Sequence, residues 1–272
     1  MTANDNDDAA IGRTVPTPEM PAALVTGGGH RIGRAIALSL ARAGWNVAVH
    51  YRDAAAEAQS VVEEIEAMGR RATRLPADLG QEHEAQALVP AALGALGPLG
   101  CLVNNASTFE YDNVETATRE SWDAHIEPNL RAPFVLTQAF ARQVPDNPGT
   151  PAAVVNILDQ RVWNLTPHFV SYTVSKAGLW ALTRTMALAL APRIRVNAIG
   201  PGPTLRSAQQ SEAQFEKQWT RMPLGRGTTP QEIADTVQFI LASPSMTGQM
   251  LALDGGQHLA WEQTDRTDTA TD

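Results

Sequence analysis

A tyrosine and a lysine four residues apart are the side chains in this sequence best suited to move a proton. Tyr172 and Lys176 lie at the start of a segment, 172–190, whose apolar spacing predicts a helix. Residues four apart share one helix face, so we expect the Lys176 ammonium group beside the Tyr172 phenol. A nearby positive charge favours the phenolate and would lower the tyrosine pKa, which makes Tyr172 a usable proton donor or acceptor. An exposed helix face is the alternative explanation of this pair.

A glycine-rich turn near the N-terminus predicts a phosphate-binding site. Residues 26–33 read TGGGHRIG, follow a short apolar run and lead into a segment with helical spacing. Glycines let backbone N–H groups and the helix N-terminus approach a pyrophosphate, whose charge the helix dipole favours. An ordinary strand-to-helix turn is the alternative, but the position after the first predicted strand favours nucleotide binding.

The end of the second predicted strand indicates which dinucleotide binds. NAD-dependent proteins place an Asp or Glu there to bind the ribose hydroxyls. In this sequence Tyr51 stands where the acid is expected, and Arg52 follows as a candidate partner for a 2′-phosphate, with Arg31 adding positive charge nearby. Asp53 argues mildly for NAD, and we expect it instead to cap a helix that begins at Ala54. NADP(H) is therefore the predicted cofactor.

The elements that must position these residues alternate along the chain. Seven short apolar runs predict strands, and segments with apolar residues three and four apart separate them; the runs are 22–26, 46–50, 72–76, 101–104, 152–157, 195–199 and 250–253. Continuous apolar runs are typical of strands buried on both faces. The prediction is an α/β fold, a single doubly wound Rossmann domain with a seven-stranded parallel sheet and helices on both faces.

Length and composition exclude several classes of protein. The 272 residues are 43% hydrophobic and 18% charged, which is ordinary for a globular chain. The net charge of −8 argues against nucleic-acid binding, which needs a basic face. Cys101 is the single cysteine, and the N-terminus lacks the basic and apolar parts of a signal peptide, so we expect a cytoplasmic protein. The uncharged stretch 85–109 contains prolines and glycines that would break a membrane helix, and no metal is expected.

The folded part is predicted to be one domain over residues 21–262. Residues 1–20 and 263–272 are polar, acidic and poor in large apolar groups, which predicts disordered tails. A lid is expected at about residues 204–222, where Leu205, Phe215 and Trp219 would help exclude water.

Six motifs in order along residues 22–256 resemble the short-chain dehydrogenase/reductase family. They are the turn at 26–33, Asp78, Asn104-Asn105-Ala106, Asn129, Tyr172-x-x-x-Lys176 and Pro201-Gly202. The resemblance implies that Asn129 holds a water relay to Lys176, that Asp78 meets the adenine ring, and that residues 201–204 contact the nicotinamide. The complete predicted cofactor site is Gly27, His30, Arg31, Ile32, Gly33, Tyr51, Arg52, Asp78, Leu79, Asn105, Ala106, Ser107, Tyr172, Lys176, Pro201, Gly202 and Thr204.

Two departures from the usual pattern narrow the predicted function. Arg31 stands where the turn usually has a third Gly or an Ala, and Asp159 stands where a catalytic Ser normally precedes the Tyr by thirteen positions. A serine hydroxyl donates a hydrogen bond to a substrate carbonyl, whereas an ionised carboxylate only accepts. Both departures occur in the pteridine reductases, dihydromonapterin reductases and alternative dihydrofolate reductases, which this sequence resembles. That resemblance implies NADPH-dependent reduction of a dihydropterin of the dihydromonapterin, dihydrobiopterin or dihydrofolate type.

The same resemblance implies a mechanism and a set of substrate contacts. NADPH would deliver hydride to a C=N carbon of the pterin, while Tyr172, coupled to Asp159, supplies a proton to the ring nitrogen. Ser107 is expected to contact the pterin, Phe109 to stack on it, and Arg31 to face the cofactor phosphates and the polar edge of the pterin. The predicted catalytic residues are Asn129, Asp159, Tyr172 and Lys176, and the predicted substrate-binding residues are Arg31, Ser107, Phe109, Asp159, Tyr172 and Leu205.

Two other functions remain compatible with the sequence. An NADPH-dependent carbonyl reductase acting on a ketone or thioester would keep Tyr172 and Lys176 but leave Asp159 unexplained. A non-catalytic NADP(H)-sensing protein would have no need of a proton relay. The expected partners are a small-molecule substrate and further copies of the chain, because the resemblance implies a homo-tetramer whose interfaces include helices at 121–144 and 172–190 and the strand at 250–253.

Overall fold

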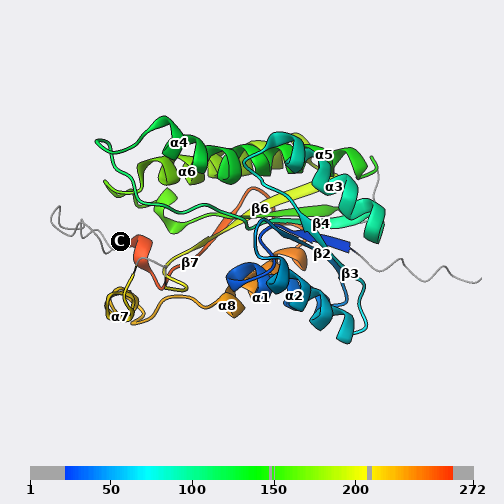
Figure 1. Ribbon diagram of the computed structural model, residues 1–272, viewed down its shortest axis with the longest axis horizontal. Coiled ribbons are helices and arrows are strands. Elements are labelled where there is room, and N and C mark those ends of the chain that lie inside the picture. The colour runs from blue at the N-terminus through cyan, green and yellow to red at the C-terminus, as the bar shows by residue number, and fades with distance from the viewer. Residues whose placement is uncertain (1–21, 147–148, 150, 207–209, 260–272) are drawn as a thin grey trace, which may run out of the picture.

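Seven strands lie side by side in one parallel sheet (Figure 1). The computed structural model describes residues 22–146, 149, 151–206 and 210–259, so the predicted tails and part of the predicted lid lie outside the described residues. The sheet order is β3-β2-β1-β4-β5-β6-β7, and every pairing is parallel. The strands are β1 (Ala22–Val25), β2 (Asn46–Tyr51), β3 (Ala72–Pro76), β4 (Leu99–Asn104), β5 (Ala152–Ile157), β6 (Ile194–Pro201) and β7 (Met250–Leu253). The predicted fold class is confirmed.

Helices cover both faces of the sheet. Those that the structure describes are α1 (Arg31–Arg42), α2 (Ala55–Ala67), α3 (Glu82–Leu96), α4 (Arg119–Ile126), α5 (Ala132–Gln143), α6 (Val170–Leu190), α7 (Glu212–Thr220) and α8 (Pro230–Leu241), with a π-helix η1 (Glu127–Arg131) and the short 3-10 helices η2 (Gln160–Val162) and η3 (Gln257–Leu259). Helices α1, α2 and α8 pack on one face, and α3, α5 and α6 pack on the other (Figure 1). This is the doubly wound arrangement that the alternating sequence predicts.

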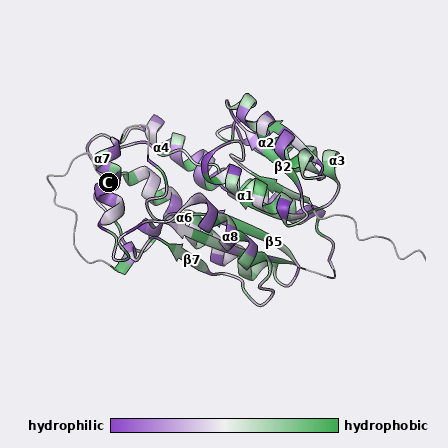
Figure 2. Cartoon of the chain, turned by 90° about the horizontal axis from the view of Figure 1, so that it is seen from below, coloured by the Kyte–Doolittle hydropathy of each residue, from purple (hydrophilic) through white to green (hydrophobic). Residues whose placement is uncertain are grey.

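Most strand residues are apolar because helices cover both faces of the sheet. In β1, Ala22 and Leu24 pack into the core on the α3–α5–α6 side, while Ala23 and Val25 pack into the core on the α1–α2–α8 side. Side chains alternate between the two faces of a strand, so a four-residue apolar run serves two cores. Figure 2 shows the resulting concentration of hydrophobic residues in the strands between the helix layers.

The strand order reverses between β1 and β4, which places the carboxyl ends of these two strands at a crevice. Thr26, directly after β1, joins the two strand ends: its hydroxyl oxygen accepts from the backbone N–H groups of Asn105 (2.9 Å) and Ala106 (3.0 Å). The Asn105 side-chain amide donates back to the Thr26 carbonyl at 2.8 Å. These bonds fix the glycine-rich turn against the loop that follows β4.

Two local expectations prove wrong. The helix expected at 121–144 is interrupted by the π-helix η1, which separates α4 from α5. Asp53 does not cap a helix, because its carboxylate pairs with Arg52 at 2.7 Å and α2 begins at Ala55 without a side-chain cap. Pro90 lies inside α3, which continues to Leu96 with Leu88, Val89 and Ala92 buried on its inner face. Within the described ranges, no helix is both long enough and apolar enough to cross a membrane.

Candidate active site

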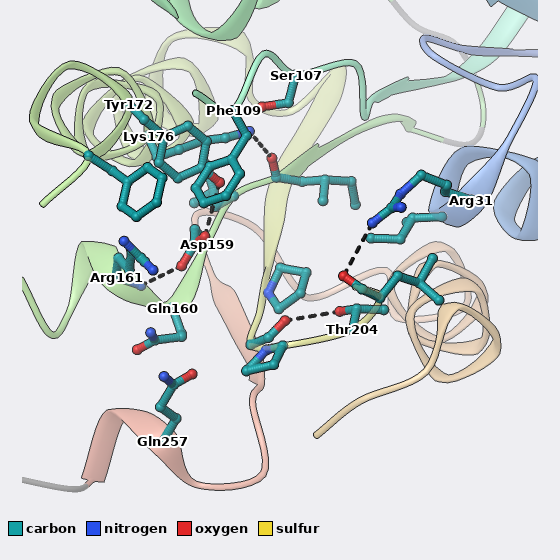
Figure 3. A pocket seen from close by; sticks show the side chains of 18 of the residues that line it. Arg31, Ser107, Phe109, Asp159, Gln160, Arg161, Tyr172, Lys176, Thr204 and Gln257 are labelled. Atoms are coloured by element: carbon teal, nitrogen blue, oxygen red, sulfur yellow. Dashed lines mark hydrogen bonds between the residues drawn. The ribbon is translucent and has the colours of Figure 1, made fainter. Parts of the chain in front are cut away.

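A cavity of about 530 Å³ opens at the carboxyl ends of the strands, a size suited to a small organic ligand. The predicted site residues that line it are Arg31, Ile32, Asn105, Ser107, Phe109, Asp159, Tyr172, Lys176, Pro201, Gly202, Thr204 and Leu205. Figure 3 shows Arg31 on one side of the cavity and Asp159, Tyr172 and Phe109 gathered on the other. The structure therefore brings the predicted catalytic tyrosine, lysine and aspartate together with the predicted substrate-binding residues.

The Tyr172 hydroxyl donates a hydrogen bond to Asp159. The distance from Tyr172 Oη to Asp159 Oδ2 is 2.9 Å, and the other carboxylate oxygen accepts from the Arg161 backbone N–H at 2.8 Å. Asp159 can reach Tyr172 because it follows β5 and caps η2, while Tyr172 lies in the first turn of α6. A serine at this position would meet the tyrosine as a hydroxyl, whereas the carboxylate meets it as an acceptor.

The expectation that Lys176 lowers the pKa of Tyr172 is wrong, because the pKa of Tyr172 is raised. Burial raises the pKa of Tyr172 well above its ordinary value of 10, and the adjacent Asp159 charge raises that pKa further. Burial also lowers the pKa of Lys176 to about 8, although Asp159 opposes this shift. Lys176 Nζ lies 5.7 Å from the centre of the tyrosine ring and donates to the Ile157 carbonyl at 2.9 Å. Burial and the Asp159 charge together outweigh the opposing charge of Arg161 on the pKa of Tyr172, so Tyr172 carries its proton.

Asn129 lies behind the catalytic pair, fully buried in the π-helix. Its side-chain oxygen accepts from the Thr108 N–H at 2.8 Å, and its amide nitrogen donates to the Thr108 carbonyl (2.9 Å) and to the Ser175 hydroxyl (3.2 Å). Ser175 immediately precedes Lys176 on α6. Asn129 thus connects the loop after β4 to the helix that carries the catalytic pair, and its role in a water relay stays a prediction.

A buried polar cluster anchors the start of α6, next to Tyr172. The Asp112 carboxylate accepts from the Ser171 N–H at 3.2 Å and from the Ser171 hydroxyl at 2.5 Å. His125 Nε2 accepts from the Glu110 N–H at 3.0 Å, so its proton lies on Nδ1, which is 2.7 Å from Ser171 Oγ. Because Phe169 offers no side-chain cap, Asp112 supplies the missing acceptor at this helix N-terminus from a distant loop.

Aromatic rings form the wall of the cavity around the tyrosine. Phe109 stacks on Phe169 with ring centres 4.5 Å apart, and it makes an edge-to-face contact with the Tyr172 ring, with centres 4.7 Å apart. The Phe109 side chain stays 41% exposed, so part of it faces the cavity. Its predicted stacking on a substrate ring remains a prediction.

The glycine-rich turn has the geometry of a cradle for phosphates. Gly27 has φ +61°, and a Cβ at Gly33 would lie 2.1 Å from the Gly27 carbonyl oxygen, so no side chain fits at that position. His30 forms no side-chain cap at the start of α1, and the first turn of α1 contains no acidic residue. The N–H groups of this helix end are therefore left for an anionic ligand, which a dinucleotide pyrophosphate supplies.

Buried His50 holds this turn in place. Its Nδ1 accepts from the Gly27 N–H at 2.9 Å, and its Nε2 lies 3.0 Å from the Ala77 carbonyl, to which it donates. Burial lowers the pKa of His50, which agrees with a neutral ring that accepts at one nitrogen and donates at the other. The sequence did not predict a role for His50.

Basic side chains gather where a 2′-phosphate is expected. Arg52 is exposed and pairs with Asp53, while Arg74 on β3 donates to the Tyr51 hydroxyl at 2.9 Å. The sequence did not predict a role for Arg74, because its position beside Tyr51 depends on the pairing of β2 with β3. Asp78, after β3, accepts from the Gly80 N–H, and the side chain of Leu79 is buried in the core.

Arg31 joins the turn to the start of the predicted lid. Its guanidinium donates to the carbonyls of Leu205 (3.2 Å) and Arg206 (3.1 Å), while its backbone has φ +53°. Thr204 donates to the Gly202 carbonyl at 3.0 Å, and α7 adds the Phe215–Trp219 ring pair, with centres 5.3 Å apart. The contact of Arg31 with phosphates and substrate stays a prediction, as does the movement of the lid.

Several residues that line the cavity were not predicted from the sequence: Tyr111, Gln160, Arg161, Phe169, Gln218 and Gln257. The sequence could have indicated Arg161 as a site residue, because it stands two residues after Asp159 at the end of a predicted strand. Gln257 could not have been predicted to line the cavity, because η3 contacts η2 only in the folded chain. Over the described parts of the chain, no group of three or more His, Cys, Asp or Glu side chains could hold a metal ion.

Comparison with known proteins gives a family match over nearly the whole described chain. Residues 28–258 match the family described as "Enoyl-(Acyl carrier protein) reductase". The structure is similar to FolM alternative dihydrofolate reductase 1 from Brucella canis complexed with NADP, at 45% identity and a TM-score of 0.86, covering 91% of this chain and 97% of that one.

Two further relatives carry other descriptions. A short chain dehydrogenase from Burkholderia cenocepacia in complex with NADP is 34% identical, with a TM-score of 0.82, covering 88% of this chain and 98% of that one. The 3-oxoacyl-[acyl-carrier-protein] reductase FabG of Staphylococcus aureus is 33% identical over 87% of this chain and 98% of its own length. From the extent of these matches, this chain belongs to the short-chain dehydrogenase/reductase family.

Proposed function

We propose that this protein reduces a dihydropterin to its tetrahydro form with NADPH. The observation that carries the proposal is the hydrogen bond from Tyr172 to Asp159 at the centre of the cavity. A carboxylate cannot donate to a ketone oxygen, but it accepts from the ring N–H and amino groups of a pterin. The Brucella FolM structures, described as alternative dihydrofolate reductases with NADP, support the same substrate class.

The residues that would hold the cofactor fit a phosphorylated dinucleotide. The turn around Gly27 and Gly33 leaves backbone space for the pyrophosphate, and Arg52 and Arg74 offer guanidinium groups for a 2′-phosphate. No acidic side chain occupies the Tyr51 position, where ribose hydroxyls would be bound in an NAD enzyme. When bound, NADPH supplies the hydride for the C=N carbon of the pterin.

The chain itself supplies the proton. Tyr172 holds its hydroxyl proton beside Asp159 and is placed to act as a general acid toward the ring nitrogen that becomes N–H. Asp159 orients that hydroxyl, and Lys176 provides the positive charge that stabilises the tyrosine as its proton leaves. Phe109 offers a flat apolar surface for the pterin ring.

Oxidation of NADPH, followed with dihydropterins and with ketones side by side, tests the proposal. We expect turnover of at least one dihydropterin and little turnover of simple ketones. Efficient ketone reduction with no dihydropterin reduction would contradict it. That result would favour the carbonyl reductase, which the similarity to FabG supports as the second candidate.

A further inference from the structure

Arg161 is a buried cation without a matching anion. The residue is 7% exposed, and one terminal guanidinium nitrogen is buried without a hydrogen-bond partner. Its guanidinium lies 4.8 Å from the centre of the Phe169 ring and 5.9 Å from that of Phe109. Across residues 22–146, 149, 151–206 and 210–259, no carboxylate forms an ion pair with it. The nearby Asp159 carboxylate is engaged instead by the Tyr172 hydroxyl and the Arg161 backbone.

Two carboxamides continue this end of the cavity. Gln160 and Gln257 each bury a side-chain oxygen that has no hydrogen-bond partner. They come from η2 and η3, which lie against each other, and Figure 3 shows both side chains below Arg161 and Asp159. Three side chains with an unpartnered buried polar atom thus line the cavity on the Asp159 side, away from Arg31 (Figure 3).

A buried charge without a partner lowers the stability of the fold, and a protein retains one most readily where a bound ligand supplies the opposite charge. A guanidinium that packs over an aromatic ring can keep N–H groups free for a planar, bidentate anion, and a carboxylate has that shape. The carboxamides of Gln160 and Gln257 add hydrogen bonds suited to an amide group beside such a carboxylate.

We propose that Arg161 is a specificity residue that binds a carboxylate on the substituent of the substrate ring, so that acidic, amide-linked substrates are preferred to neutral ones. The proposal rests on the proposed pterin function, since it assigns the far end of the same cavity. The ring lies against Tyr172 and Asp159, and its substituent extends toward Arg161, Gln160 and Gln257.

The test compares two substrates that share a ring and differ in charge, dihydrofolate with its acidic amide-linked tail and dihydrobiopterin with its neutral one. Arg161→Met should lower kcat/KM for dihydrofolate about tenfold or more, mainly through KM, because a charge-assisted bond is lost. For dihydrobiopterin the loss should stay below about threefold, clearly smaller than the loss of tenfold or more expected for dihydrofolate. Arg161→Lys keeps the charge and should lie between the wild type and Arg161→Met.

A matched control variant and a binding measurement test whether Arg161 itself sets the preference for the acidic substrate. Arg42→Met removes the same charge from the far end of α1 and should leave the preference between the two substrates unchanged. Quenching of tryptophan fluorescence reports the binding of folate and biopterin to the NADP⁺-saturated protein without turnover. Folate should bind more weakly to Arg161→Met than to the wild type, and biopterin should bind equally to both.

The outcomes distinguish this inference from the proposed function. Equal losses for both substrates would overturn it, because Arg161 would then serve the ring or Tyr172. Unchanged kinetics, or no folate binding by the wild type, would overturn it too. If the wild type reduces neither dihydropterin but binds folate through Arg161, the proposed function fails and the inference stands.

Discussion

At the scale of single residues, Asp159 separates the two candidate chemistries most sharply. Asp159→Ser places a hydroxyl beside Tyr172, which can donate to a carbonyl oxygen but offers no carboxylate to a pterin. We expect dihydropterin reduction to fall about tenfold or more, about 1.4 kcal/mol in the barrier, while activity on small activated ketones holds or rises. Steady-state rates on both substrates measure this. Asp159→Asn keeps the shape without the charge and serves as the control, and a rise in ketone turnover with no pterin activity in the wild type would contradict the assignment.

Tyr172 should be dispensable for cofactor binding but not for turnover. Tyr172→Phe removes only the hydroxyl, so the proton donor is lost and the ring contacts with Phe109 remain. We expect kcat to fall at least about a hundredfold, the lower range for general acid catalysis, with NADPH affinity unchanged by fluorescence titration. Tyr111→Phe removes a hydroxyl that contacts His168 in the same cavity and should have a much smaller effect. Unchanged dihydropterin reduction in Tyr172→Phe would rule out the mechanism.

Sequence pattern predicted the residues that act through spacing along one element and missed those that act through packing. Tyr172 and Lys176 share a helix face by their four-residue separation alone. The direction of the tyrosine pKa shift was not predictable, because burial is its largest cause and burial is a property of the folded chain. The pairing of Phe169 with Phe109, and the burial of Arg161 against both, likewise arise only when distant loops meet.

At the scale of elements, His50 ties the phosphate-binding turn to β2 and β3, which gives the fold a defined response to acid. Its pKa is lowered from its ordinary value of 6.5 by burial, so below that pH the unfolded chain binds a proton that the folded chain resists. Stability to urea should therefore fall as the pH drops below 6.5, and NADPH affinity should fall with it because protonated Nδ1 cannot accept from Gly27. His50→Gln keeps an acceptor and a donor without titrating, so its pH dependence should be shallower. An equally steep dependence in His50→Gln would contradict this role.

Element boundaries followed from the sequence wherever apolar runs were continuous. All seven predicted strands are present, with ends that lie within two residues of the expected ones. The π-helix η1 was not predictable, because a shift in backbone hydrogen bonding leaves no mark on apolar spacing. This omission matters, since η1 carries the buried Asn129 that connects the loop after β4 to α6.

At the scale of the whole molecule, the outer face of α6 has the character of a contact between copies of the chain. Val174, Ala181 and Leu188 are exposed at seven-residue spacing, which puts them on one face of the helix, and Leu188 is 85% exposed. The second expected interface, β7, is an edge strand of the sheet with partly exposed side chains. Apolar residues on a helix face and an open sheet edge both favour association with a symmetric copy.

We therefore predict a homo-tetramer in which α6 forms one two-fold interface and β7 another. Sedimentation velocity at micromolar concentration should give a tetramer for the wild type. Leu188→Glu places a charge in the α6 interface and should reduce the assembly to dimers held by β7, because an unpaired charge in an apolar contact is costly. Val114→Glu alters a comparably exposed residue, 84% exposed, in the loop between β4 and α4, so the tetramer should persist in that variant. A stable wild-type monomer, or a Leu188→Glu tetramer, would contradict this arrangement, because α6 would then present its apolar face to solvent alone.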